Sequence, residues 1–238
     1  WATPISIPQG SMTGAKPVRP ILRPLRSRIE GRCIGARRSG SMLEAHESEC
    51  MKTPAPLLFL ELEGVLVLVG SKKRELVADA VSNIARGDSN WRDHQGTWED
   101  LFAAEPVRQL KALHDQFQLR YCLTTNWTGL LDKAATLNVL RLSGLGFVAS
   151  NLHARWEVDR GLGVVRRSDQ IEAWLRHHSD QHDQWVVLDS EVRGPDVLNW
   201  PEHLAAHTVF CCSDVGLTGF EAGATRERFL QLQPSQKN

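Results

Sequence analysis

The stretch LLFLELEGVLV, residues 57–67, decides the fold of this chain. It has the apolar residues of a buried strand but also contains two glutamates. Its leading apolar residues predict a strand that runs through a protein interior. Glu61 and Glu63 interrupt the apolar run, although an unpaired buried carboxylate is costly. We therefore expect a strand over 57–63 whose two glutamates form the rim of a crevice. Residues two apart share one side of a strand, so both side chains should project together, and Gly64 then lets the chain turn away.

From this stretch onward the sequence alternates between strand and helix patterns. The expected strands span 57–63, 119–124, 146–150, 185–189 and 207–210. The expected helices span 105–117 and 127–140, followed by one capped by Ser168 and a last one opened by a capping box, Thr218–Glu221. Strands that alternate with helices indicate an α/β fold. We predict a three-layer α/β/α, Rossmann-like domain with a mainly parallel sheet over residues 51–238.

The composition is that of an ordinary globular protein and argues against several classes of function. The chain has 238 residues, and its 28 Lys and Arg balance its 28 Asp and Glu, so no global field favours nucleic acid or a membrane surface. No apolar run reaches the roughly 20 residues that a membrane helix needs. The five cysteines include no CxxC pair, which favours a reducing compartment. We expect a cytoplasmic protein without a membrane or nucleic-acid partner; a protein partner stays open.

Residues 1–50 differ from the rest of the chain. The segment KPVRPILRPLRSRIEGRCIGARRSG, residues 16–40, is rich in proline, glycine and arginine and has no strand or helix periodicity. We expect a disordered or tag-like basic leader, with a basic arm that binds an acidic partner as the alternative. The leader takes no part in the fold prediction.

Three of the expected strands end in polar residues. In chain order they are Glu61 and Glu63, then Thr124, Thr125 and Asn126, and then Asp189, Ser190 and Glu191. In a parallel α/β sheet, ligands bind beyond the carboxyl ends of the strands. Carboxylates there suit Mg²⁺, which completes its octahedron with water and phosphate oxygens. The alternative is that these are only solvated strand ends.

The order of these features resembles the haloacid dehalogenase-like (HAD) superfamily, in particular a small capless bacterial and phage branch. Its first motif is a strand followed by Asp-x-Asp-Gly-Val/Thr, and LLFLELEGVL, residues 57–66, has this frame with glutamate at both acidic positions. Thr124 is similar to the Ser or Thr that ends the strand of the second motif. The segment 166–191, followed by GLT at 216–218, is similar to the later motifs. The resemblance covers about 55–232 and implies a domain without a large cap.

The resemblance implies a Mg²⁺-dependent phosphohydrolase acting on a small phosphorylated molecule or another phosphate-bearing ligand. By position, Glu61 would be the nucleophile and Glu63 the acid and base, while Thr124 would bind a phosphoryl oxygen. Arg166 or Arg167 would supply the cation of the third motif. The implied metal ligands are Glu61, Glu63, Asp189 and Glu191, and the implied substrate-binding residues are Thr124, Thr125, Asn126 and Arg166.

The sequence departs from that pattern around the expected metal site. A glutamate carboxylate lies about one bond, ~1.5 Å, further out than that of aspartate, and a ~1 Å misplacement can cost about 10²-fold in rate. Ser190 stands where the branch has a second aspartate, and Thr128 where an arginine follows the tryptophan. We therefore expect a HAD-like hydrolase with impaired catalysis. The alternative is a non-catalytic pseudophosphatase that binds a ligand or a protein.

Overall fold

The computed structural model describes residues 55–99, 101–158, 166–178, 184–190 and 199–233, so the expected leader lies outside the described residues. The described elements are, in chain order, β1 (Leu57–Leu60), α1 (Lys72–Arg86), η1 (Trp91–His94), α2 (Gln95–Trp98), α3 (Ala104–Phe117), β2 (Arg120–Leu123), η2 (Asn126–Gly129), α4 (Lys133–Leu142), α5 (Gly146–Ser150), β3 (Leu152–Glu157), α6 (Arg167–His178), β4 (Trp185–Ser190), α8 (Glu202–Ala205), β5 (Thr208–Cys211) and α9 (Gly219–Leu232).

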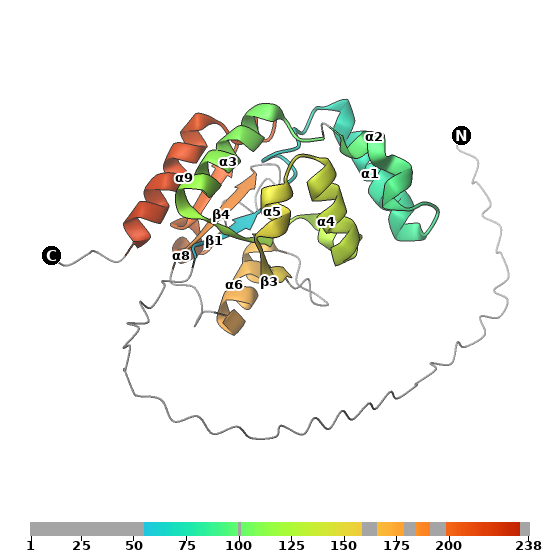
Figure 1. The fold of residues 1–238 in the computed structure, drawn as a ribbon. Helices are drawn as coiled ribbons and strands as arrows, with labels where there is room; N and C mark the ends of the chain where they lie inside the picture. The colour runs from blue at the N-terminus through green and yellow to red at the C-terminus, as the bar shows by residue number, and fades with distance from the viewer. Residues whose placement is uncertain (1–54, 100, 159–165, 179–183, 191–198, 234–238) are drawn as a thin grey trace, which may run out of the picture. The chain divides into compact units, whose positions relative to one another are not determined.

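The five strands form one parallel sheet in the order β3-β2-β1-β4-β5 (Figure 1). The apolar run before Glu61 therefore forms the central strand, β1. Parallel strands bring their carboxyl ends to the same edge of the sheet, so the residues that follow β1, β2 and β4 are neighbours. The predicted α/β architecture with a mainly parallel sheet is confirmed.

Alternate side chains of β1 pack into two separate hydrophobic clusters, one on each face of the sheet. Leu58 and Leu60 belong to the larger cluster, which also contains residues of α3, α4, α5 and α9. Leu57 and Phe59 belong to the smaller one, together with residues of α6 and α8. Figure 1 shows α3 and α9 on one side of the strands and α6 and α8 on the other. The fold is thus the three-layer arrangement that the sequence predicts.

The short strand expected over 146–150 is wrong, because this segment forms helix α5. A short apolar run such as GFVAS has too few residues for periodicity to separate a strand from a helix. The strand at this place is β3, residues 152–157, which the sequence analysis did not assign. Its sequence, LHARWE, is polar because β3 is an edge strand, and edge strands carry charged residues that discourage pairing with other chains.

Two expected helix starts also differ from the structure. The helix expected over 127–140 is divided into the 3-10 turn η2 and helix α4, which begins after Asp132. Asp132 caps α4 by accepting a hydrogen bond from the amide of Ala135 at 2.7 Å. Helix α6 begins at Arg167, so Ser168 lies within its first turn and does not cap it. That start places Arg167 at the end of α6 nearest the strand ends.

Other local predictions are confirmed. Helix α3 covers residues 104–117 and buries Leu110 and Leu113. The capping box at the start of α9 is present: Thr218 accepts a hydrogen bond at the helix start, and the Glu221 carboxylate accepts one from the Thr218 amide at 3.0 Å. Within the described ranges, no helix combines the length and apolar character needed to cross a membrane.

Candidate functional site

Glu61 follows β1 directly and is buried at the carboxyl edge of the sheet. Its amide donates to the carbonyl of Leu188 at 3.0 Å, so the chain still lies along β4 at this point. Only 1% of Glu61 is exposed. Its Oε1 accepts hydrogen bonds from the amides of Leu62 at 2.9 Å and Glu63 at 3.1 Å. The expected place on an open rim is therefore wrong for Glu61, whose carboxylate is turned back onto the chain that follows it.

Glu63 lies beyond the end of β1 and touches Glu61 through its backbone, since its amide donates to Glu61 Oε1. Strand β1 ends at Leu60, so the rule that residues two apart share one side of a strand does not extend to this pair. Glu63 is partly buried and forms an isolated bridge with Val67, next to Gly64, whose φ is 77°. Among the described residues, no hydrogen bond or ion pair involves the Glu63 carboxylate.

Thr124 follows β2 and lies beside the end of β1. Its amide donates to the carbonyl of Leu60 at 3.0 Å, and its side chain is buried. The next residue, Thr125, is also buried, and its carbonyl accepts from the hydroxyl of Thr128 at 3.1 Å. Asn126 then begins η2. The second polar strand end therefore reaches the site mainly through Thr124.

Asp189 lies beside Glu61 because β1 and β4 pair with Leu60 opposite Leu188. It is 4% exposed, and its Oδ1 accepts from the amide of Ser190 at 2.7 Å. Glu191, expected as a further metal ligand, lies outside the described residues. The sequence prediction that acidic groups from separate strands meet at one edge thus holds for Glu61 and Asp189.

Arg167 joins the three strand ends. One of its Nη atoms forms an ion pair with Glu61 Oε2 and donates to Thr124 Oγ1 at 3.2 Å. Its Nε lies 3.6 Å from Asp189 Oδ2. Arg167 is 7% exposed, so this is a buried charged cluster. Of the two arginines that the sequence offered, only Arg167 takes this position: Arg166 pairs with Asp169 on the surface at 3.1 Å.

The described residues do not fit a divalent cation in this arrangement. They contain no group of three or more His, Cys, Asp or Glu side chains that could hold a metal ion. Mg²⁺ binds hard oxygen ligands in near-ideal octahedral geometry. Both oxygens of Glu61 accept from protein donors, and the cation between Glu61 and Asp189 is a guanidinium. In this arrangement Glu61, Glu63 and Asp189 alone do not offer the set of oxygen ligands that the resemblance implies, and the fourth implied ligand, Glu191, lies outside the described residues.

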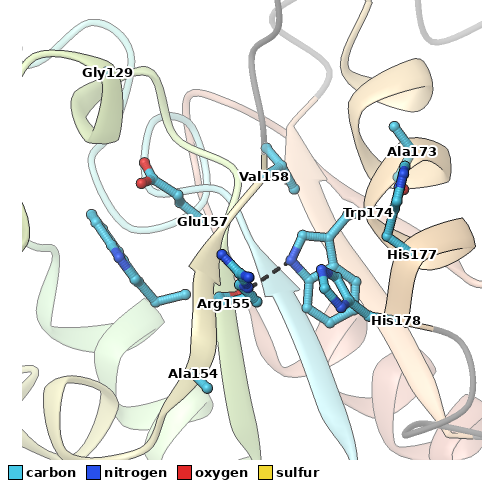
Figure 2. A pocket seen from close by; sticks show the side chains of 10 residues that line it. Gly129, Ala154, Arg155, Glu157, Val158, Ala173, Trp174, His177 and His178 are labelled. Atoms are coloured by element: carbon cyan, nitrogen blue, oxygen red, sulfur yellow. Dashed lines mark hydrogen bonds between the residues drawn. The ribbon is translucent and has the colours of Figure 1, made fainter.

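A cavity of about 580 Å³ lies between β3 and α6, and the sequence analysis did not anticipate it. Figure 2 shows Arg155 of β3 facing Trp174 and His178 of α6. The indole nitrogen of Trp174 donates to the carbonyl of Arg155 at 3.2 Å. On β2, residues 121 and 123 pair with residues 152 and 157 of β3, so the edge strand bulges here. Bulges are frequent next to functional sites, where they redirect side chains.

This cavity adjoins the buried charged cluster through the segment that follows β2. Val158, which lines the cavity, donates its amide to the carbonyl of Leu123 at 3.3 Å, and Thr124 comes next in the chain. Gly129, another lining residue, ends η2. Burial lowers the pKa of His178, and nearby Arg155 adds to this effect. The cavity wall at His178 therefore favours a neutral imidazole.

The thiol of Cys122 is buried next to the site, and its environment disfavours the thiolate. Cys122 lies in β2 and is fully buried. Burial, helped by Glu157, raises the pKa of its thiol well above the ordinary value. A thiolate is the reactive form of cysteine, so this shift disfavours a reactive thiol at Cys122.

Comparison with known proteins places these observations in one family. No curated protein and no solved structure matched the chain. A sequence profile described as "HAD domain in Swiss Army Knife RNA repair proteins" matches residues 57–222, which include all five strands and the buried charged cluster. The chain therefore belongs to this family of HAD domains, within the HAD-like hydrolases.

Proposed function

We propose that this domain acts on a phosphate ester at the carboxyl edge of its sheet and that its hydrolytic turnover is impaired. The observation that carries the proposal is the meeting of Glu61, Thr124, Arg167 and Asp189 in one buried cluster. These are residues that the HAD resemblance assigns to nucleophile, phosphate binding, third-motif cation and metal binding. Family membership supports the same type of chemistry.

In the proposed reaction, Glu61 is the nucleophile and Glu63 moves the proton. Glu61 Oε2 bonds to phosphorus as the ester P–O bond breaks, and the departing alcohol oxygen takes a proton from Glu63. Water, deprotonated by Glu63, then attacks the same phosphorus, which releases phosphate and restores the Glu61 carboxylate. Arg167 carries five N–H donors in one plane and can neutralise charge on the phosphoryl oxygens.

The position of the Glu61 carboxylate accounts for impairment. Its longer side chain lets Oε1 fold back onto the amides of Leu62 and Glu63, while Oε2 contacts Arg167. The attacking oxygen, Oε2, must move away from Arg167 before it can approach phosphorus in line with the departing oxygen, while the Oε1 bonds hold the carboxylate back. A misplacement of ~1 Å in a reacting group can cost about 10²-fold in rate, so a slow reaction follows.

A phosphorylated RNA end is the ligand class that we propose. The support is the description of the family, whose members are HAD domains of RNA repair proteins. The zero net charge argues against an extended polyanion surface, but a single terminal phosphate at one buried cluster needs no such surface. The cavity beside β3 offers about 580 Å³ next to the cluster for the nucleoside that carries the phosphate.

A second candidate, a non-catalytic phosphate-binding domain, is favoured by a different observation. Glutamate stands at both positions where the first motif has aspartate, and among the described residues the Glu63 carboxylate makes no hydrogen bond or ion pair with the cluster. In that case the Glu61 carboxylate and Arg167 would serve recognition alone. The two candidates differ in turnover, not in the place of binding.

The test compares the full chain with a Glu61→Asp, Glu63→Asp double variant. Both are assayed on p-nitrophenyl phosphate and on RNA oligonucleotides phosphorylated at the 5′ or 3′ end, with Mg²⁺ and with EDTA. We expect slow turnover by the natural chain and a gain of about 10²-fold in the double variant. An Asp189→Asn version of the double variant serves as the control and should lose the gain.

Each outcome decides between the alternatives. A turnover number within the usual enzyme range of about 1–10³ s⁻¹ for the natural chain would refute the impairment. No turnover in either protein, with phosphorylated RNA still bound, would favour the non-catalytic candidate. No turnover and no binding of phosphorylated RNA or inorganic phosphate would contradict the proposal that this edge receives a phosphate ester.

A further inference from the structure

The four carboxylate oxygens of Glu61 and Asp189 all face donors of the chain itself. Glu61 Oε1 accepts from two backbone amides, and Oε2 contacts the Arg167 guanidinium. Asp189 Oδ1 accepts from the Ser190 amide at 2.7 Å, and Oδ2 lies 3.6 Å from Arg167 Nε. A divalent cation at this place would therefore compete with the Arg167 guanidinium for Glu61 Oε2 and Asp189 Oδ2.

The charge of the cluster is also largely compensated. Counting the described residues alone, two buried carboxylates face one guanidinium, which leaves one negative charge. Three backbone N–H groups point at the carboxylates and offset part of it. Helix α6 begins at Arg167 and adds the positive end of its dipole, equivalent to about half an elementary charge. The electrostatic demand for a divalent ion is thus much smaller than at two bare carboxylates.

We infer that Arg167 takes the place of the divalent cation that HAD membership implies, so that Glu61 and Asp189 stay assembled without metal. The guanidinium bridges the same two strand ends, β1 and β4, that a metal would have to bridge. This role concerns the site of the proposed function but does not depend on turnover. The inference predicts that Mg²⁺ does not change the thermal stability of the natural chain and stabilises the chain only when Arg167 is removed.

The experiment follows thermal unfolding of the full chain as Mg²⁺ is titrated against an EDTA reference. For the natural chain we expect no saturable rise in Tm. For Arg167→Ala we expect a low Tm in EDTA and a saturable rise with Mg²⁺, because a ligand that binds only the folded state stabilises it. Arg166→Ala is the matched control, since it removes the neighbouring surface arginine, and it should behave like the natural chain.

Two results would overturn the inference: a saturable rise in the natural chain that Asp189→Asn abolishes, or no Mg²⁺ response in a folded Arg167→Ala variant. If Arg167→Ala does not fold, Mn²⁺ binding to the natural chain, followed by electron paramagnetic resonance, decides the matter. Bound Mn²⁺ that is lost in Asp189→Asn contradicts the inference, and absence of bound Mn²⁺ supports it. These measurements of Tm and Mn²⁺ binding do not depend on phosphate-ester turnover. The proposed function and the proposed role of Arg167 can therefore be refuted independently.

Discussion

Arg166 and Arg167 are neighbours in the chain, yet they lie in two regions of opposite character. Arg166 pairs with Asp169 on the surface, where 53% and 37% of the two side chains are exposed. Arg167 turns into the carboxyl edge of the sheet, where its side chain and those of Glu61 and Asp189 are at most 6% exposed. Exposed pairs contribute about 0–1 kcal/mol, whereas breaking a buried pair costs about 3–5 kcal/mol. An arginine ion pair therefore contributes little to stability in the exposed region, whereas breaking the buried pair is strongly destabilising.

A pair of glycines repeats this contrast between the two regions. Gly216 and Gly87 have the same φ of 77°. A Cβ on Gly216 would lie 2.6 Å from the Val65 carbonyl oxygen and 2.9 Å from a methyl group of Leu68, in the turn that follows β1. A Cβ on Gly87, at the end of α1, would meet nothing within 4 Å. The chain is closely packed around Gly216 at the carboxyl edge, whereas the surface around Gly87 at the end of α1 is open.

The largest effect should come from Arg167→Met, which removes the buried cation and leaves two carboxylates without it. We expect the free energy of unfolding to fall by about 3–5 kcal/mol. Urea titration followed by circular dichroism measures it. Arg166→Met is the matched control and should change stability by no more than about 1 kcal/mol. Equal losses for the two variants would contradict the contrast between the buried and the exposed arginine.

A smaller difference in the free energy of unfolding should separate Gly216→Ala from Gly87→Ala. Both variants force alanine into the left-handed region, at about 1–2 kcal/mol. Gly216→Ala should lose a further ~1–3 kcal/mol, because its methyl group overlaps backbone and side-chain atoms. Chemical denaturation of both variants under the same conditions gives the difference. If the two losses are equal, the close approach of Gly216 to Val65 is not a constraint.

The sequence was sufficient for the fold and for the edge at which the polar strand ends meet, because those features rest on local signals. The apolar run before Glu61 predicted the central strand, and the polar ends of β1, β2 and β4 predicted which edge carries the site. In a parallel sheet that edge follows from topology alone. The sequence therefore predicts that Glu61, Thr124 and Asp189 meet at one edge, as the structure shows.

The remaining features depend on three-dimensional contacts that no local pattern encodes. The sequence could not choose between Arg166 and Arg167, because the choice depends on the residue at which α6 begins. Nor could it show that Glu61 Oε1 would fold back onto the following amides. The cavity was missed because its wall belongs to the bulged edge strand β3, whose polar sequence carries no strand signal.

The most direct test of the account is the coupling between Glu61 and Arg167 in a double-mutant cycle. Glu61→Gln, Arg167→Met and the combined variant are unfolded in urea, and the deviation from additivity is measured. Because the two side chains form a buried ion pair, we predict a coupling energy of about 1–3 kcal/mol. Losses that add within about 0.3–0.5 kcal/mol, as for distant sites, would contradict it.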